Sequence, residues 1–169
     1  FSGTQLGAMS TTSFANLSTT QVGSLTTTQI KGLSTTAVVA LTTTQIGTLS
    51  TTQFQAFSTT DIRSLTTAQI GAMTTAQVGT LTDAQLDQLT TTQLVTFSTT
   101  QVGALTKTQI GFLSTTATAA LTTTQIGALT TTQVQGFSFT QLNALTTSAV
   151  ASMTTTQVGS LTTTQIKGL

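Results

Sequence analysis

The side chains that could do chemistry are few and far apart. Two of the three aspartates, Asp83 and Asp87, lie four residues apart, a spacing at which two carboxylates can loosely share a cation. Two carboxylates without further anionic ligands make a poor calcium site. Serine and threonine hydroxyls are abundant, but the chain has no histidine to activate one and no cysteine to act as a thiol nucleophile. We therefore expect no enzyme activity, no cofactor and no metal centre.

The charge balance excludes two classes of partner. Four basic and three acidic side chains give a net charge of +1, too little for a nucleic-acid patch or a polybasic membrane anchor. Serine and threonine interrupt every apolar stretch before it reaches the roughly 18 residues of a membrane-spanning helix. We expect neither nucleic-acid binding nor membrane insertion. Glycans remain open as partners, since Asn16-Leu17-Ser18 has the N-glycosylation pattern and the many threonines would suit O-linked sugars.

The chain is an array of eight-residue repeats. Cut from Phe1, residues 1–169 form one continuous array of twenty-one octads plus Leu169. Position 1 of each octad is Leu, Met or Phe, and position 2 is Ser or Thr. Position 6 is Val, Ile, Leu or Phe everywhere except at Thr118. Position 5 is Gln in sixteen octads, and the exceptions are Ser13, Ala37, Asp61, Ala117 and Ala149.

The spacing within one octad predicts a short helix. Ser or Thr at position 2 with Gln at position 5 is the capping box, in which each side chain accepts a hydrogen bond from the other residue's backbone N–H. If position 2 is the N-cap, the apolar positions 1 and 6 are the two members of a hydrophobic staple. We predict a helix over positions 3–8 of each octad. Gly at position 7 lets the backbone leave that helix near its end.

Such short helices are unstable alone, so the octads must stack. We predict an all-α solenoid whose coils share one core, with small residues at positions 4 and 8 permitting close approach. Residues 21–80 resemble residues 101–160, ten octads later, and this even offset suggests two octads (sixteen residues) per coil. The run QVGSLTTTQIKGL argues against that unit, because its copies at 21–33 and 157–169 are seventeen octads apart.

A β-solenoid is the alternative fold, because Thr, Val and Ile favour strands. The apolar positions are separated alternately by five and three residues, so a regular strand would place half of them on each face. Bulges could absorb that mismatch. The capping pattern favours the helical fold.

The few charges indicate which side of each helix faces solvent. Lys31, Arg63, Asp87 and Lys167 occupy position 7, and Asp83 and Lys107 occupy position 3, on the same helix face. We expect positions 3 and 7 to point outward and positions 1 and 6 inward. Four bulky residues interrupt otherwise small or polar positions, and we predict that they form contacts between neighbouring solenoids: Val39, Val95, Phe112 and Phe139.

The octad Leu-Ser/Thr-Thr-Thr-Gln-Ile/Val-Gly-Ala resembles the octapeptide repeats of long, low-complexity bacterial surface and secreted proteins, which are described as adhesin-like or filament-forming. Related arrays often have Pro-Glu at positions 3 and 4, where this chain has Thr. The resemblance covers the whole chain and implies an extracellular or cell-surface location. Because no distinct capping repeat begins or ends the array, we expect it to be a segment of a longer chain.

Three functions are compatible with such an array. The first is a structural protein that forms an extracellular filament, sheath or adhesin stalk by solenoid extension and lateral self-association, which near-zero charge favours. The second is an ice-binding, Thr-rich solenoid, although three consecutive threonines do not alternate as on a flat strand. The third is a passive spacer for a binding domain elsewhere in the parent chain.

Overall fold

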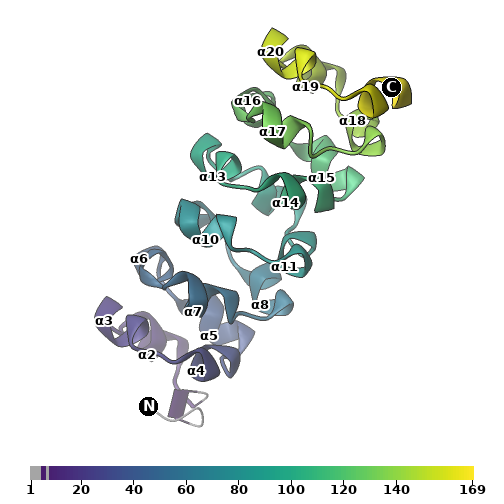
Figure 1. Ribbon diagram of the computed structural model, residues 1–169. Coiled ribbons are helices and arrows are strands. Elements are labelled where there is room, and N and C mark those ends of the chain that lie inside the picture. The colour runs from purple at the N-terminus through teal and green to yellow at the C-terminus, as the bar shows by residue number, and fades with distance from the viewer. Residues whose placement is uncertain (1–4, 7) are drawn as a thin grey trace. The chain divides into compact units, whose positions relative to one another are not determined.

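The computed structural model describes residues 5, 6 and 8–169, and within them it is built of short helices without strands. Contacts divide the chain into two compact units, Phe1–Gln88 and Leu89–Leu169. Figure 1 shows the short helices of each unit joined by equally short connections. The all-α prediction is confirmed, and the β-solenoid alternative is wrong.

From Thr11 onward each octad contains one helix, as its spacing predicts. The helices of the first unit are α2 (Thr11–Ala15), α3 (Thr19–Gly23), α4 (Thr27–Lys31), α5 (Thr35–Ala40), α6 (Thr43–Thr48), α7 (Thr51–Gln55), α8 (Thr59–Ser64), α9 (Thr67–Gly71), α10 (Thr75–Gly79) and α11 (Asp83–Asp87). Those of the second unit are α12 (Thr91–Leu94), α13 (Thr99–Gly103), α14 (Lys107–Phe112), α15 (Thr115–Ala120), α16 (Thr123–Ala128), α17 (Thr131–Val134), α18 (Phe139–Ala144), α19 (Thr147–Ala151), α20 (Thr155–Gly159) and α21 (Thr163–Gly168).

The helix starts follow the capping box. Thr130, for example, is extended at φ −72° and ψ 160°, and its side chain accepts a hydrogen bond from the backbone N–H of Gln133. The Gln133 side chain in turn accepts from the backbone N–H of Thr130. Complete boxes cap all of these helices except α2, α5, α15 and α19, whose octads have Ser or Ala at position 5. The predicted N-cap at position 2 is confirmed.

The helix ends differ from the prediction. None of the described glycines has a positive φ, so Gly at position 7 does not release the chain through a left-handed conformation. Each helix instead stops where the next position 1 and position 2 become extended; Leu49, for example, has φ −61° and ψ 135°. Two extended residues are enough to break the helix before the next N-cap begins another.

Every coil contains three octads. In the first unit α2 contacts α5, which contacts α8, and α3 and α4 contact α6 and α7 in the same way. The second unit repeats the pattern, with α12, α15, α18 and α21 in one column. Three octads of eight residues make a coil of 24 residues, so the predicted coil of sixteen is wrong. The ten-octad offset reflects similarity between sequences and is not a whole number of coils.

The core is formed by positions 1 and 6, as predicted. Val22, Ile46 and Ile70 at position 6 are completely buried, and Leu25, Leu49 and Met73 at position 1 of the following octads lie beside the same interior. Aromatic residues extend this pattern, and the rings of Phe54 and Phe57 pack edge to face with centroids 5.4 Å apart. Position 4 is exposed along the chain, so its small residues are not needed for coils to approach.

Candidate functional site

The glutamine at position 5 is the principal polar contact between coils. The Gln133 Oε1 accepts from the backbone N–H of Thr130 at 2.8 Å, which completes the capping box. Its Nε2 donates to the carbonyl oxygens of Val102 at 2.9 Å and Leu105 at 2.7 Å, in the preceding coil. One carboxamide therefore caps its own helix and also binds the end of another. The side chain is buried, with both ends satisfied.

The same bond recurs at fixed distances along the sequence. In the first unit Gln77 donates to Ile46 and Leu49, and in the second unit Gln157 donates to Ile126 and Leu129, always 31 and 28 residues earlier. These acceptors lie at the C-terminal end of a helix, where carbonyl groups lack partners within the helix. These glutamines therefore bind helix ends of the preceding coil in both units. The sequence predicted only the capping half of this role.

A second row of contacts lies at position 7, where we expected only solvent. The side-chain amides of Gln55, Gln135 and Asn143 donate to the position-8 carbonyls of the next coil, at 2.9, 2.9 and 2.8 Å. At Gly111, an added Cβ would lie 3.0 Å from the carbonyl oxygen of Gly136. Position 7 is thus at the seam between coils. The prediction that this position faces solvent is confirmed for the charged residues Lys31, Arg63, Asp87 and Lys167, which are exposed, and the contacts with the next coil add to it.

The four predicted contact residues are all partly exposed. Val39 and Val95 occupy position 7, whereas Phe112 is 53% exposed and Phe139 is 48% exposed. A Cβ added at Gly168 would clash with the Phe139 side chain, so the base of this ring rests on the next coil of its own unit. For Val39, Val95 and Phe112, the feature in common is that each side chain is partly exposed. Their role between solenoids remains a prediction.

The last coil carries a further apolar surface. Val150, Val158 and Ile166 occupy position 6, which is buried in earlier octads, yet they are 47%, 48% and 57% exposed. Leu142, one coil earlier than Ile166, is only 4% exposed. The position-6 side chains of one three-octad coil are therefore left uncovered. This is the surface on which a further coil would stack.

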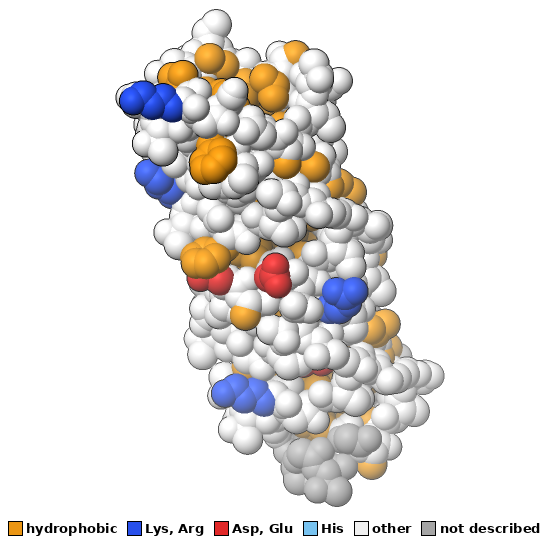
Figure 2. Space-filling view, turned by 90° about the vertical axis from the view of Figure 1, so that its right-hand side faces the viewer, with side chains coloured by type: hydrophobic (Ala, Val, Ile, Leu, Met, Phe, Trp, Pro, Cys, Tyr) orange, Lys and Arg blue, Asp and Glu red, His pale blue; other side chains and the backbone are white. Residues whose placement is uncertain are grey.

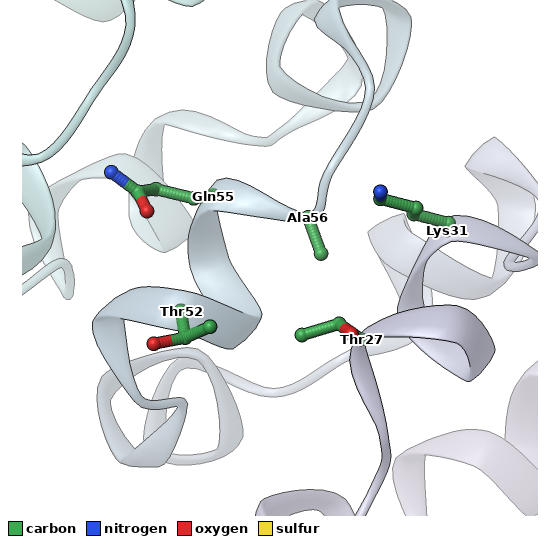
Figure 3. Close-up of a pocket in the computed structure, with 5 residues that line it drawn as sticks. All are labelled: Thr27, Lys31, Thr52, Gln55 and Ala56. Carbon is green, nitrogen blue, oxygen red and sulfur yellow. The ribbon is translucent and has the colours of Figure 1, made fainter.

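A shallow pocket of about 270 Å³ lies between α4 and α7. Figure 3 shows Thr27 and Lys31 on α4, Thr52 and Gln55 on α7, and Ala56 directly after α7. Its polar groups are a single ammonium, two hydroxyls and an amide, and the Gln55 amide already donates to the Thr80 carbonyl. This lining is too open and too sparsely charged to define a ligand.

The remaining candidates lie apart from one another on the surface. Asp83 and Asp87 occupy the two ends of α11 and are exposed, and among the described residues no three acidic, His or Cys side chains group as metal ligands do. Asn16 is exposed at the end of α2, where a glycan would be accessible. Figure 2 shows that charged side chains are sparse on the face in view. None of the described helices has the length and apolarity needed to cross a membrane.

The comparison with protein families identifies the array. The model of the ALTTAQ repeat matches residues 3–35, 22–51, 30–59, 51–83, 83–115 and 140–169, which together cover more than half of the chain. None of the curated proteins matches the chain significantly. The matched segments include many of the capping and core positions and the glutamines Gln77 and Gln157, whereas residues 116–139, which contain Gln133, lie outside them. The chain belongs to the ALTTAQ repeat family.

Proposed function

We propose that this chain is a structural protein whose array extends coil by coil and packs laterally to form a filament, sheath or adhesin stalk outside the cell. The observation that carries the proposal is the glutamine bond between coils. Because Gln77 and Gln157 make the same two bonds in different units, the same kind of interface joins coils within each unit. A repeated nearest-neighbour interface is what an extended solenoid needs.

The surface supports lateral packing. Only seven side chains are charged, four basic and three acidic, so two arrays would repel each other weakly. Phe112 and Phe139 add large exposed apolar groups at positions that are small or polar in other octads. An aromatic side chain that loses its remaining exposed surface in a contact contributes favourable free energy to it. The surface is therefore suited to self-association.

The uncovered coil at Val150, Val158 and Ile166 supports lengthwise extension. Its apolar side chains would be buried by another coil of the same design, whether that coil belongs to the same chain or to a second copy. Contacts of this head-to-tail kind generate open assemblies when their rotation does not close a ring. The proposed location outside the cell rests on the resemblance to surface arrays.

The experiment is sedimentation velocity over a range of concentrations, with negative-stain images of the same samples. We expect the unaltered chain to form elongated particles that grow with concentration. Phe112→Ala with Phe139→Thr restores the common residue at each position and should shift the distribution toward monomer. Asp83→Thr is the matched control, because it also restores the common residue but removes no apolar group.

Two outcomes would contradict the proposal. A chain that stays monomeric at every concentration would be a spacer and would not be a filament-forming protein. Labelling of intact source cells with an antibody against the array tests the location separately. Labelling only after the cells are opened would contradict an extracellular role.

A further inference from the structure

Two departures from the octad pattern meet at one point inside the second unit. In octad 20, Gln157 donates from Nε2 to the carbonyl oxygens of Ile126 and Leu129 at 2.9 and 2.6 Å. In octad 19 the corresponding residue is Ala149, which has no amide. The carbonyl groups 31 and 28 residues before it are those of Thr118 and Leu121. Ala149 therefore leaves these two acceptors without the donor that other octads supply.

Thr118 is the second departure. It is the one position-6 residue of the chain that is not apolar, and its side chain is completely buried. Its Oγ1 has no hydrogen-bond partner within the protein. The Thr118 carbonyl oxygen accepts from the Leu121 backbone N–H at 3.2 Å, but the Leu121 carbonyl group lacks the glutamine donor. A buried hydroxyl without a partner is unfavourable, so its presence beside such a carbonyl group requires an explanation.

The space and the polar groups fit water. Replacing Gln by Ala removes a methylene group and a carboxamide, a volume of roughly two water molecules at about 30 Å³ each. A buried water needs two to four polar partners. The Leu121 and Thr118 carbonyl oxygens can accept from it, and the Thr118 hydroxyl can accept or donate. The backbone N–H of Thr146, the N-cap residue of α19, has no Gln oxygen to donate to in this octad and supplies a donor at the other end.

We infer that Thr118, Leu121 and Ala149 enclose a buried water site that takes the place of the glutamine carboxamide in octad 19. The water donates to the carbonyl groups at the end of one coil and binds the Thr118 hydroxyl. The polar residue at position 6 and the missing glutamine are then parts of one arrangement.

High-resolution crystal structures of the unaltered chain and of Ala149→Gln test this inference. In the unaltered chain we expect one or two ordered waters within about 2.7–3.2 Å of the Leu121 oxygen and the Thr118 Oγ1. In Ala149→Gln, the new Nε2 should bind both carbonyl groups and displace that water. A dry site, with the Thr118 hydroxyl rotated onto the carbonyl group of Ser114 four residues earlier, would overturn the inference.

Thermal unfolding supplies a test that needs no crystals. Thr118→Val removes a partner of the water in the unaltered chain and should lower the melting temperature by about 2–4 °C. In the Ala149→Gln background the hydroxyl has lost its water, so the same substitution should raise the melting temperature. Thr116→Val, at an exposed position of the same helix, controls for the change of residue type. A rise of equal size in both backgrounds would show that the hydroxyl has no water to lose.

Discussion

At the scale of single residues, the Gln133 side chain joins its own helix start to the end of a helix in the preceding coil. Its oxygen accepts from Thr130, and its nitrogen donates to Val102 and Leu105. Asp or Glu at this position could complete the capping box but could not donate to the carbonyl groups. The chain contains no glutamate at all, and Asp61 is the one acidic residue at position 5. This preference for a neutral amide is the signal from which the second bond could have been predicted.

Gln133→Ala should lower the free energy of unfolding by about 1–3 kcal/mol, because it removes the amide donor to the Leu105 carbonyl group and one of the donors to the Val102 carbonyl group. Gln21→Ala is the matched control. Gln21 is exposed and makes its capping bonds at the start of the array, so its loss should cost less than about 1 kcal/mol. Urea unfolding measures both. Equal losses would mean that the bond between coils contributes nothing beyond the cap.

Two glycines near the ends of their helices, Gly136 at position 8 and Gly103 at position 7, should differ in their effects. A Cβ at Gly136 would clash with the backbone carbonyl group of Lys107, whereas a Cβ at Gly103 would meet nothing within 4 Å. Gly136→Ala should therefore destabilise the protein by about 1–3 kcal/mol. Gly103→Ala should stabilise it by about 0.5–1 kcal/mol, because alanine favours the helix. Chemical denaturation of the two variants checks this, and a loss at Gly103 as large as at Gly136 would contradict it.

At the scale of the helix, the cap at position 2 determines where each element begins. Thr122 accepts from the backbone N–H of Gln125 at 3.1 Å, while Thr124, two residues later, is exposed. Thr122→Ala should cost about 1 kcal/mol, whereas Thr124→Ala should be neutral or slightly stabilising. Thermal melts followed by circular dichroism distinguish the two. If both substitutions cost the same, the capping account of these helices would be wrong.

Element boundaries could be predicted from the octad because their determinants are local. The N-cap, its Gln partner and the staple residues all lie within six positions, and the structure places the helix starts at Thr43 and Thr131 as that spacing requires. The number of octads per coil could not be predicted in the same way. It depends on how helices such as α3 and α6 pack across 24 residues, and every octad offers nearly the same core residues to any partner.

For the candidate contact residues too, local features could be predicted from the octad and contacts between coils could not. Exposure of Val39 and Val95 followed from their position 7 in the octad. The contact of Phe139 with Gly168 could not be predicted, because it joins octads that are neighbours only in a three-octad coil. The bond from Gln55 to the Thr80 carbonyl depends on the same stacking. These missed residue contacts therefore share one cause, the wrong number of octads predicted per coil.

At the scale of the whole molecule, the free energy of folding comes from apolar burial and neutral hydrogen bonds. The chain has four basic and three acidic residues, so few ionic interactions could be screened. Raising sodium chloride from about 0.05 M to about 0.5 M should shift the melting temperature by no more than about 2 °C. Differential scanning calorimetry provides the measurement. A decrease of many degrees would show that ion pairs stabilise the fold.

The most direct test of the central claim measures which octads are neighbours. The chain has no cysteine, so two engineered cysteines have no other thiol in the chain with which to form a disulfide. Because a Cβ at Gly168 would contact the Phe139 side chain, the pair Phe139→Cys with Gly168→Cys is within reach of a disulfide. The pair Phe139→Cys with Ser160→Cys is the control, since these positions would be neighbours in a coil of two octads.

Mild oxidation in dilute solution, followed by mass spectrometry under non-reducing conditions, shows whether each pair of cysteines has formed a disulfide. The three-octad coil predicts an intramolecular disulfide in the Phe139 and Gly168 variant and free thiols in the Phe139 and Ser160 variant. The reverse result, a disulfide with residue 160 and none with residue 168, would contradict the coil and the glutamine contacts that depend on it.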